Sequence, residues 1–423
     1  MQWTAPYACI TGLGFISSIG NNEKDVIRSL KTLKSGIQPY RFFGEADKSD
    51  VHVGGPVAGF DFPTASWAGW KYPDNYTIPK ELLRGLPPHG VYAFCAIEQA
   101  LAQAGLSGKE ISSPHIGLHC ASAGSPVLMH RHLKQLHEDK GRRGRPLGVV
   151  STISGTLNFN LAAHYGIQGA NLGFVSACAS SSHAIGYALD EIRLGRQDAV
   201  LVVGAEDFTA ESILPFGAMN ALSRKSESDA SCPWDVRRDG FVGSGGACAL
   251  LLESPDFSQR RGAKALAKVT GWGQSSDGAG RTASHPEGSG LGRAMESALR
   301  DASIQAKSID YINAHATSTR VGDLSEAKAI SEVFTKNACS PLVSSTKGLT
   351  GHPLSMSGAM EAAFCTLFLR DGFYAGNAHL RNVDPECSNL NLPRCSSNKN
   401  LQYILSNSSG FGGANVALVF ERA

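Results

Sequence analysis

The sequence lacks the features that would place the chain in a membrane, outside the cell or on nucleic acid. It has no uninterrupted apolar run of about 18 residues, the length that a membrane-spanning helix needs. Its first residues, 1–6, have neither a basic region nor a long apolar segment, so no secretory signal is expected. The net charge of +2 over 423 residues argues against binding nucleic acid through bulk positive charge. We therefore expect a cytoplasmic protein with no membrane span and no nucleic-acid partner.

The ten cysteines lack a pattern as well, because no two of them are spaced as Cys-x-x-Cys. Their scatter argues against a zinc ribbon or a disulfide scaffold and fits a reducing compartment. We predict no metal site. The composition, 42% hydrophobic and 18% charged, is ordinary for a globular protein, and the length allows two domains or one large double-cored unit.

One cysteine stands out by its place in the predicted secondary structure. Residues 171–174 read as a short strand, and Ile185, Leu189 and Ile192 recur at helical spacing. Cys178 is thus expected at a turn from strand to helix, where unpaired backbone N–H groups and the helix dipole favour a thiolate. A thiolate is a nucleophile, so Cys178 is a candidate catalytic residue. The alternative is a small buried core cysteine, the commonest fate of a free thiol.

Three further segments are unusually polar for the ends of strands. They are residues 313–319 after a predicted strand at 309–314, residues 345–352 after a strand at 341–345, and residues 406–415 between strands at 401–406 and 415–420. Two of these segments contain a histidine, His315 and His352, at the point where α/β folds place their active sites.

The order of strand, reactive turn and helix of small residues around Cys178 recurs around residues 347–352. This repetition predicts an internal duplication into two α/β halves that pack against each other. We place the halves at residues 1–254, which contain Cys178, and 255–423, which contain both histidines. Within the second half, Asp323 and Glu326 have the spacing of a capping box that opens a helix.

Taken together, these segments resemble the β-ketoacyl-acyl-carrier-protein synthases, the condensing enzymes of fatty-acid and polyketide assembly. The resemblance covers nearly the whole chain. The motifs that carry it are Ile10–Gly14 (ITGLG), Pro233–Asp235 with Arg238–Val242, Asn313–His315, Lys347–His352 and the Gly410–Gly413 turn. It implies the thiolase fold, an α-β-α-β-α five-layer sandwich built from two duplicated halves, usually as a homodimer, with a heterodimer as the other option.

The resemblance also implies a role for each matching residue. Cys178 would accept an acyl group from an acyl carrier protein, and condensation with carrier-bound malonyl would lengthen the chain by two carbons. His315 and His352 would bind the malonyl thioester carbonyl and stabilise the enolate formed by decarboxylation. The supporting residues would be Lys347 for the position of His315 and the local electrostatics, Glu361 as a partner on the following helix, the N–H groups of Cys178 and Phe411 as the oxyanion hole, Phe411 also as the gate of the acyl pocket, and Thr317 and Thr319 for the phosphopantetheine arm.

The implied partner is the acyl carrier protein, and no metal or redox cofactor is needed because decarboxylation drives the reaction. Acyl carrier proteins are acidic, so a local basic patch is expected to dock them. The residues that resemble the family's docking positions are Arg142, Arg143, Lys225, Lys80 and Arg84. The alternative for the basic run at 140–145 is a loop of solvated charges.

Some positions depart from the family pattern. Ala123 stands in the pocket-lining loop where a larger aliphatic residue often limits acyl length, and Ala316, Ser409 and the segment 353–355 also differ from the usual residues. None of these changes removes a catalytic group, and together they suggest an altered acyl pocket. A competing hypothesis is a catalytically silent or non-elongating subunit of a heterodimer; the intact set of Cys178, His315 and His352 argues against a silent one.

Overall fold

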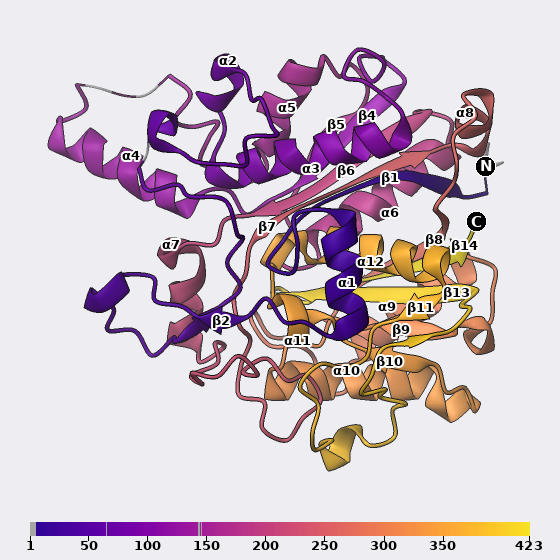
Figure 1. The fold of residues 1–423 in the computed structure, drawn as a ribbon. Coiled ribbons are helices and arrows are strands. Elements are labelled where there is room, and N and C mark those ends of the chain that lie inside the picture. Colours follow the sequence, from indigo (N-terminus) through magenta and orange to yellow (C-terminus); the bar gives the residue numbers. More distant parts are fainter. Residues whose placement is uncertain (1–5, 65, 143, 145) are drawn as a thin grey trace.

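The computed structural model describes residues 6–64, 66–142, 144 and 146–423 (Figure 1). Ten strands form one sheet in the order β10-β9-β13-β14-β8-β1-β7-β6-β4-β5. They are β1 (Ala8–Ile16), β4 (Ile116–Ala121), β5 (Asn171–Phe174), β6 (Ala199–Glu206), β7 (Gly246–Glu253), β8 (Ala267–Ser276), β9 (Tyr311–Asn313), β10 (Leu342–Ser344), β13 (Tyr403–Gly410) and β14 (Ala414–Arg422). Two small ribbons pair β2 (Gln38–Pro39) with β3 (Val53–Gly54) and β11 (Phe373–Tyr374) with β12 (Ser397–Asn398).

The two halves of the large sheet have the same topology. Numbered within each half, both have the strand order 3-2-4-5-1, as β5-β4-β6-β7-β1 and as β10-β9-β13-β14-β8. The pairing directions match too: β4 is parallel to β5 and β6, β9 is parallel to β10 and β13, and the remaining pairs within each half are antiparallel. The halves join where β1 and β8 pair over three residues. The predicted duplication is therefore confirmed.

Helices cover both faces of each half of the sheet. They are α1 (Glu23–Thr32), α2 (Lys80–Leu83), α3 (Pro88–Ala104), α4 (Pro126–Glu138), α5 (Leu157–Tyr165), α6 (Ser180–Arg193), α7 (Ala210–Ile213), α8 (Pro255–Arg260), α9 (Ser289–Asp301), α10 (Arg320–Val333), α11 (Lys347–Thr350) and α12 (Ser357–Asp371). Helices α6 and α12 pack together between the two halves of the sheet, which form the two strand layers. Helices α3 and α5 cover the outer face of the first half, and α9, with α10 beside it, covers that of the second half (Figure 1). The three largest hydrophobic cores fill the spaces between these layers. This is the five-layer sandwich of the thiolase fold.

A glycine in each half lets the outer helix approach the sheet closely. In β1, a Cβ atom on Gly14 would lie 1.8 Å from the carbonyl oxygen of Ala96 in α3. In β8, a Cβ atom on Gly273 would lie 2.3 Å from the carbonyl oxygen of Ala294 in α9. Both strands contain the sequence Thr-Gly-x-Gly, at residues 11–14 and 270–273. The two halves therefore share a packing device as well as a topology.

One predicted helix start is wrong. Helix α10 begins at Arg320, three residues before the predicted capping box. Asp323 is buried inside the helix and accepts hydrogen bonds from the backbone N–H groups of Ser318, at 3.1 Å, and Trp234, at 3.0 Å. The boundary between halves at 254/255 falls between β7 and β8 and stays a prediction. Across the described ranges, no helix is long and apolar enough to cross a membrane.

Candidate active site

Cys178 lies on a tight turn between β5 and α6, at the N-terminal end of the helix, as predicted. Ala177, the residue before it, has a φ of +50°, in the left-handed region that residues with a Cβ rarely adopt. Ser180 fixes the turn, because its Oγ accepts from the N–H of Ser176 at 2.8 Å and donates to the carbonyl of Ala177 at 2.6 Å. The turn presents the half-buried thiol to a cavity, beside a small hydrophobic cluster.

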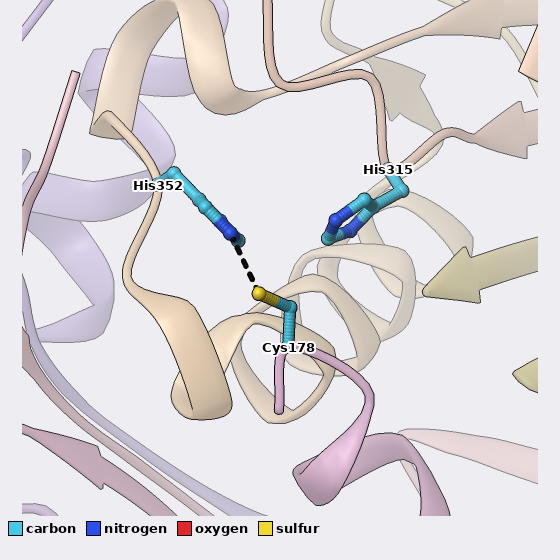
Figure 2. A group of neighbouring side chains, drawn as sticks. All are labelled: Cys178, His315 and His352. Carbon is cyan, nitrogen blue, oxygen red and sulfur yellow. Dashed lines mark hydrogen bonds between the residues drawn. The ribbon is translucent and has the colours of Figure 1, made fainter. Parts of the chain in front are cut away.

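Two histidines from the second half of the chain face this thiol, as Figure 2 shows. The Nε2 atom of His352 lies 3.0 Å from Sγ of Cys178. The rings of His315 and His352 have centroids 5.2 Å apart and are nearly perpendicular, at 87°. One nitrogen or sulfur atom from each of the three side chains lies within 4.8 Å of the others. These atom types and spacings also suit a metal ion, so the absence of a metal stays a prediction.

Burial dominates the acid–base properties of these three groups. It raises the pKa of the Cys178 thiol to about 12, against the opposing effect of the Lys347 charge. Desolvation thus opposes the thiolate that the helix N-terminus is expected to favour. Burial also holds the pKa of His315 and of His352 well below the usual value, and Lys347 adds to the effect. At neutral pH the site holds a neutral thiol beside two neutral imidazoles.

Lys347 and Glu361 form an ion pair next to the histidines. Both side chains are completely buried, and Nζ of Lys347 donates to Oε1 of Glu361. Burial raises the pKa of Glu361 to about 7, with Lys347 acting in the opposite direction. Ser231 anchors the segment by donating from Oγ to the carbonyl of Lys347 at 2.8 Å. The lysine charge is therefore held where it acts on both imidazoles and on the thiol.

Glu326 is a site residue that the sequence pattern assigned to a helix cap instead. Its Oε1 atom accepts from the backbone N–H of His315 at 2.7 Å and from Nδ2 of Asn407 at 2.5 Å. The side chain also borders the cavity at Cys178, and burial raises its pKa to about 7. Asp323 and Glu326 are three residues apart on α10, a spacing that places both on one helix face. This face shared with Asp323 was the sequence feature that could have indicated an inward-facing Glu326.

The cavity around these residues has a volume of about 400 Å³. Its wall includes Thr317 and Thr319, whose Oγ1 atoms are 3.2 Å apart. It also includes Phe411, whose ring centroid lies 5.9 Å from that of Phe216. A Cβ atom on Gly410 would lie 2.6 Å from the carbonyl oxygen of Ser176, so the terminal hairpin packs directly against the Cys178 turn. The cavity thus gathers the predicted nucleophile, both histidines, the threonine pair and the predicted gate residue.

Comparison with known proteins identifies the family. Residues 8–256 match the family model of the β-ketoacyl synthase N-terminal domain, and residues 266–381 match that of the β-ketoacyl synthase C-terminal domain. The chain belongs to the β-ketoacyl synthase family. This β-ketoacyl synthase is 37% identical over 422 residues to the 3-oxoacyl-[acyl-carrier-protein] synthase 1 of Haemophilus influenzae, with 98% of each chain covered.

Solved structures agree with this assignment. A β-ketoacyl synthase from Burkholderia phymatum superposes with a TM-score of 0.89 at 31% identity, covering 99% of both chains. The ishigamide ketosynthase/chain length factor superposes with a TM-score of 0.86 at 27% identity, covering 99% of this chain and 100% of the other. The β-ketoacyl synthase described here therefore shares the fold of its family over its full length.

The remaining predicted residues of this β-ketoacyl synthase that the structure describes lie outside the cavity. Ala123 is exposed, and its backbone N–H donates to Oε1 of Glu206 at 2.9 Å. Lys80, Arg84 and Arg142 are exposed, and Arg84 borders a separate cavity of about 370 Å³. Lys225 is half-buried, with Nζ 4.0 Å from Asp239 and bonded to the carbonyl of Arg237. Arg143 lies outside the described residues. The roles assigned to all of them stay predictions.

Proposed function

We propose that this β-ketoacyl synthase catalyses a decarboxylative Claisen condensation, extending an acyl group held on Cys178 by two carbons from malonyl on an acyl carrier protein. The observation that carries the proposal is the convergence of Cys178, His315 and His352 on one cavity. The 3-oxoacyl-[acyl-carrier-protein] synthase relative, aligned over 98% of both chains, supports the carrier as the bearer of the substrates. The enzyme is then an acyltransferase of fatty-acid or polyketide assembly.

In the first step, Sγ of Cys178 attacks the carbonyl carbon of the carrier's acyl thioester. The new bond between sulfur and carbon forms as the bond to the carrier sulfur breaks. Because the thiol is neutral at rest, its proton leaves as the bond forms and passes to the departing carrier thiol. Nε2 of His352 and the charge of Lys347 support the negative charge that develops on Sγ. We assign the oxyanion hole to the N–H groups of Cys178 and Phe411.

In the second step, the bond between the malonyl methylene carbon and its carboxylate breaks, and carbon dioxide leaves. The electron pair moves into the thioester and forms an enolate. The neutral imidazoles of His315 and His352 can each donate one N–H hydrogen bond to the enolate oxygen. The enolate carbon attacks the acyl group on Cys178, the thiolate leaves, and it takes up a proton from water. Neither step requires a metal or a redox cofactor, and we propose none.

The carrier's phosphopantetheine arm is proposed to reach Cys178 past Thr317 and Thr319, which line the cavity. Phe411 would move to admit the acyl group, since the turn that bears it closes one wall of the cavity. Lys80, Arg84 and Arg142 are exposed and positively charged, as docking of an acidic carrier requires.

A homodimer is the proposed assembly. β5 is the edge strand of the first half, and Leu172 within it and Val175 just after it expose 44% and 61% of their surface. An exposed, apolar strand edge is unusual in a monomer because it invites pairing with another chain. Light scattering checks this: Leu172→Asp should produce monomers, whereas Val236→Asp, at another exposed apolar residue, should not. The ishigamide ketosynthase/chain length factor supports a heterodimer as the second option.

The proposed location is the cytoplasm. All ten cysteines are free thiols, including the exposed Cys395. Free thiols on a protein surface persist in a reducing compartment. Fractionation of cells that express the chain, followed by immunodetection, checks the location.

Intact-mass measurement after incubation with a series of acyl-loaded carriers tests the reaction. The wild-type chain should gain the mass of the acyl group, and Cys178→Ala should not. Adding malonyl-carrier should then release carbon dioxide and give a product two carbons longer. Acylation without a lengthened product would favour the non-elongating alternative. No acylation of a folded chain by any carrier would reject the proposal in favour of a silent subunit.

A further inference from the structure

The two imidazoles of the site differ in the hydrogen bonds that they make. His352 uses both nitrogens: Nε2 faces Sγ of Cys178 at 3.0 Å, and Nδ1 lies 3.2 Å from Oγ of Ser357. In Figure 2 the ring of His352 points toward the sulfur of Cys178, to which the dashed line joins it. Nδ1 of His315, by contrast, is buried and has no hydrogen-bond partner within the described part of the chain. A side chain therefore fixes the second nitrogen of one imidazole and not of the other.

Ser357 is well placed to control His352. It is the first residue of α12 and is completely buried, so water does not compete for its hydroxyl. Within the described ranges, the only hydrogen bond of its Oγ is the one to Nδ1. The neighbouring Ser355 is engaged elsewhere, because its hydroxyl donates to the carboxylate of Glu206. The hydroxyl of Ser357 is thus free to orient its proton toward the imidazole.

We propose that Ser357 is a positioning residue: its hydroxyl donates to Nδ1 of His352 and so keeps the proton of the neutral imidazole on Nε2, the nitrogen that faces Cys178. The tautomer of a neutral histidine is set by the hydrogen bond at its other nitrogen. A donor at Nδ1 leaves Nε2 as the N–H group. The inference rests on the proposed function, because that reaction needs an N–H donor first toward the sulfur and then toward the enolate oxygen.

The alternative arrangement would work against the chemistry. If Nδ1 carried the proton and donated to Ser357, Nε2 would present a lone pair to the cavity. A lone pair repels the oxygen of an enolate, whereas an N–H group stabilises it. Burial keeps the ring neutral, so His352 cannot supply both protons at once. The direction of one hydroxyl therefore decides whether His352 supports or opposes decarboxylation.

Nitrogen-15 NMR of histidine-labelled protein tests this without any substrate. The 13 histidines give overlapping signals, so the His352 signals are assigned by their loss in His352→Asn. In the wild type, Nε2 should show the chemical shift of a protonated nitrogen and Nδ1 that of an unprotonated one. Ser357→Ala should move both shifts toward a mixture of tautomers, and the control Ser355→Ala should not. A protonated Nδ1 in the wild type, or unchanged shifts in Ser357→Ala, would overturn the proposal.

Kinetics provide the second readout. Ser357→Ala should slow carbon dioxide release from malonyl-carrier by about tenfold, a typical cost of losing a group that orients a functional histidine. Acylation of Cys178 should fall less, because the sulfur tolerates a weaker donor than the enolate does. Ser357→Thr keeps the hydroxyl and should restore most of the decarboxylation rate. If no variant accepts carrier substrates, the proposed function fails while the NMR result still decides the tautomer.

Discussion

At the scale of single residues, the site depends on which charges the interior can hold. Burial keeps Cys178, His315 and His352 neutral, whereas Lys347 remains paired with Glu361. A buried ion pair contributes little net stability, because desolvation of the two charges offsets their attraction. Its position among the three reacting side chains therefore points to control of their pKa values.

Replacing Lys347 with Met should raise the pKa of both histidines, because the positive charge that disfavours the imidazolium is gone. Protonation then begins at a higher pH, so the acid limb of malonyl decarboxylation should move up by roughly one pH unit. Carbon dioxide release measured against pH checks this. Glu361→Gln leaves the lysine charge uncompensated and should move the same limb down. The same acid limb in all three proteins would show that the pair does not control the imidazoles.

The reactive residues could be predicted from the sequence because each lies in a polar motif just beyond a strand. Glu326 could not, since an acid near a helix start fits both a cap and an inward-facing site residue. Its contact with Asn407, distant in the sequence, decides between the two. The opposing effect of desolvation on the Cys178 thiol could not be predicted for a related reason: a local pattern reveals the helix N-terminus but not the depth of burial.

At the scale of elements, the duplication was visible in the repeated order of strand, turn and helix. The Thr-Gly-x-Gly repeat of β1 and β8 was a further signal, and its meaning depends on helices packed from elsewhere in the chain. The strand order 3-2-4-5-1 could not be predicted from the sequence, because nearly every pairing in it is between strands distant in the sequence.

Equivalent glycines in the two halves should respond alike to substitution. In both Gly14→Ala and Gly273→Ala the new methyl group would meet a helix carbonyl at less than 3 Å, and each should lower the free energy of unfolding by about 1–3 kcal/mol. Gly292→Ala, in α9, is the control. Apart from the helix's own backbone, the only described residue near the new Cβ atom is Val333, at 3.8 Å, so this substitution should stabilise the helix by up to about 1 kcal/mol. Denaturant unfolding measures all three. A neutral Gly273→Ala would contradict the tight packing of α9 on β8.

At the scale of the whole molecule, the net charge of +2 does not show which basic residues are solvated and which are paired with acidic groups. Lys225 is paired with Asp239 and bonded to the backbone, so its charge is already partly neutralised. Lys80 and Arg84 are exposed at the two ends of the same short helix, α2, and no ion pair within the described ranges involves them. The sequence could supply candidates for docking, but only the structure separates solvated charges from paired ones.

Reversing Lys80 to Glu should therefore raise the KM for carrier-bound substrates by about tenfold at low salt, because an acidic carrier loses one attraction and gains one repulsion. The difference from wild type should shrink as salt screens the exposed charges. Turnover of a small thioester that lacks the carrier should not change. Arg260→Glu, on α8 and outside the predicted docking set, should leave both reactions as they are. Because Lys80 does not line the cavity, an equal loss with both substrates would indicate damage to the site and would count against the proposed docking role of Lys80.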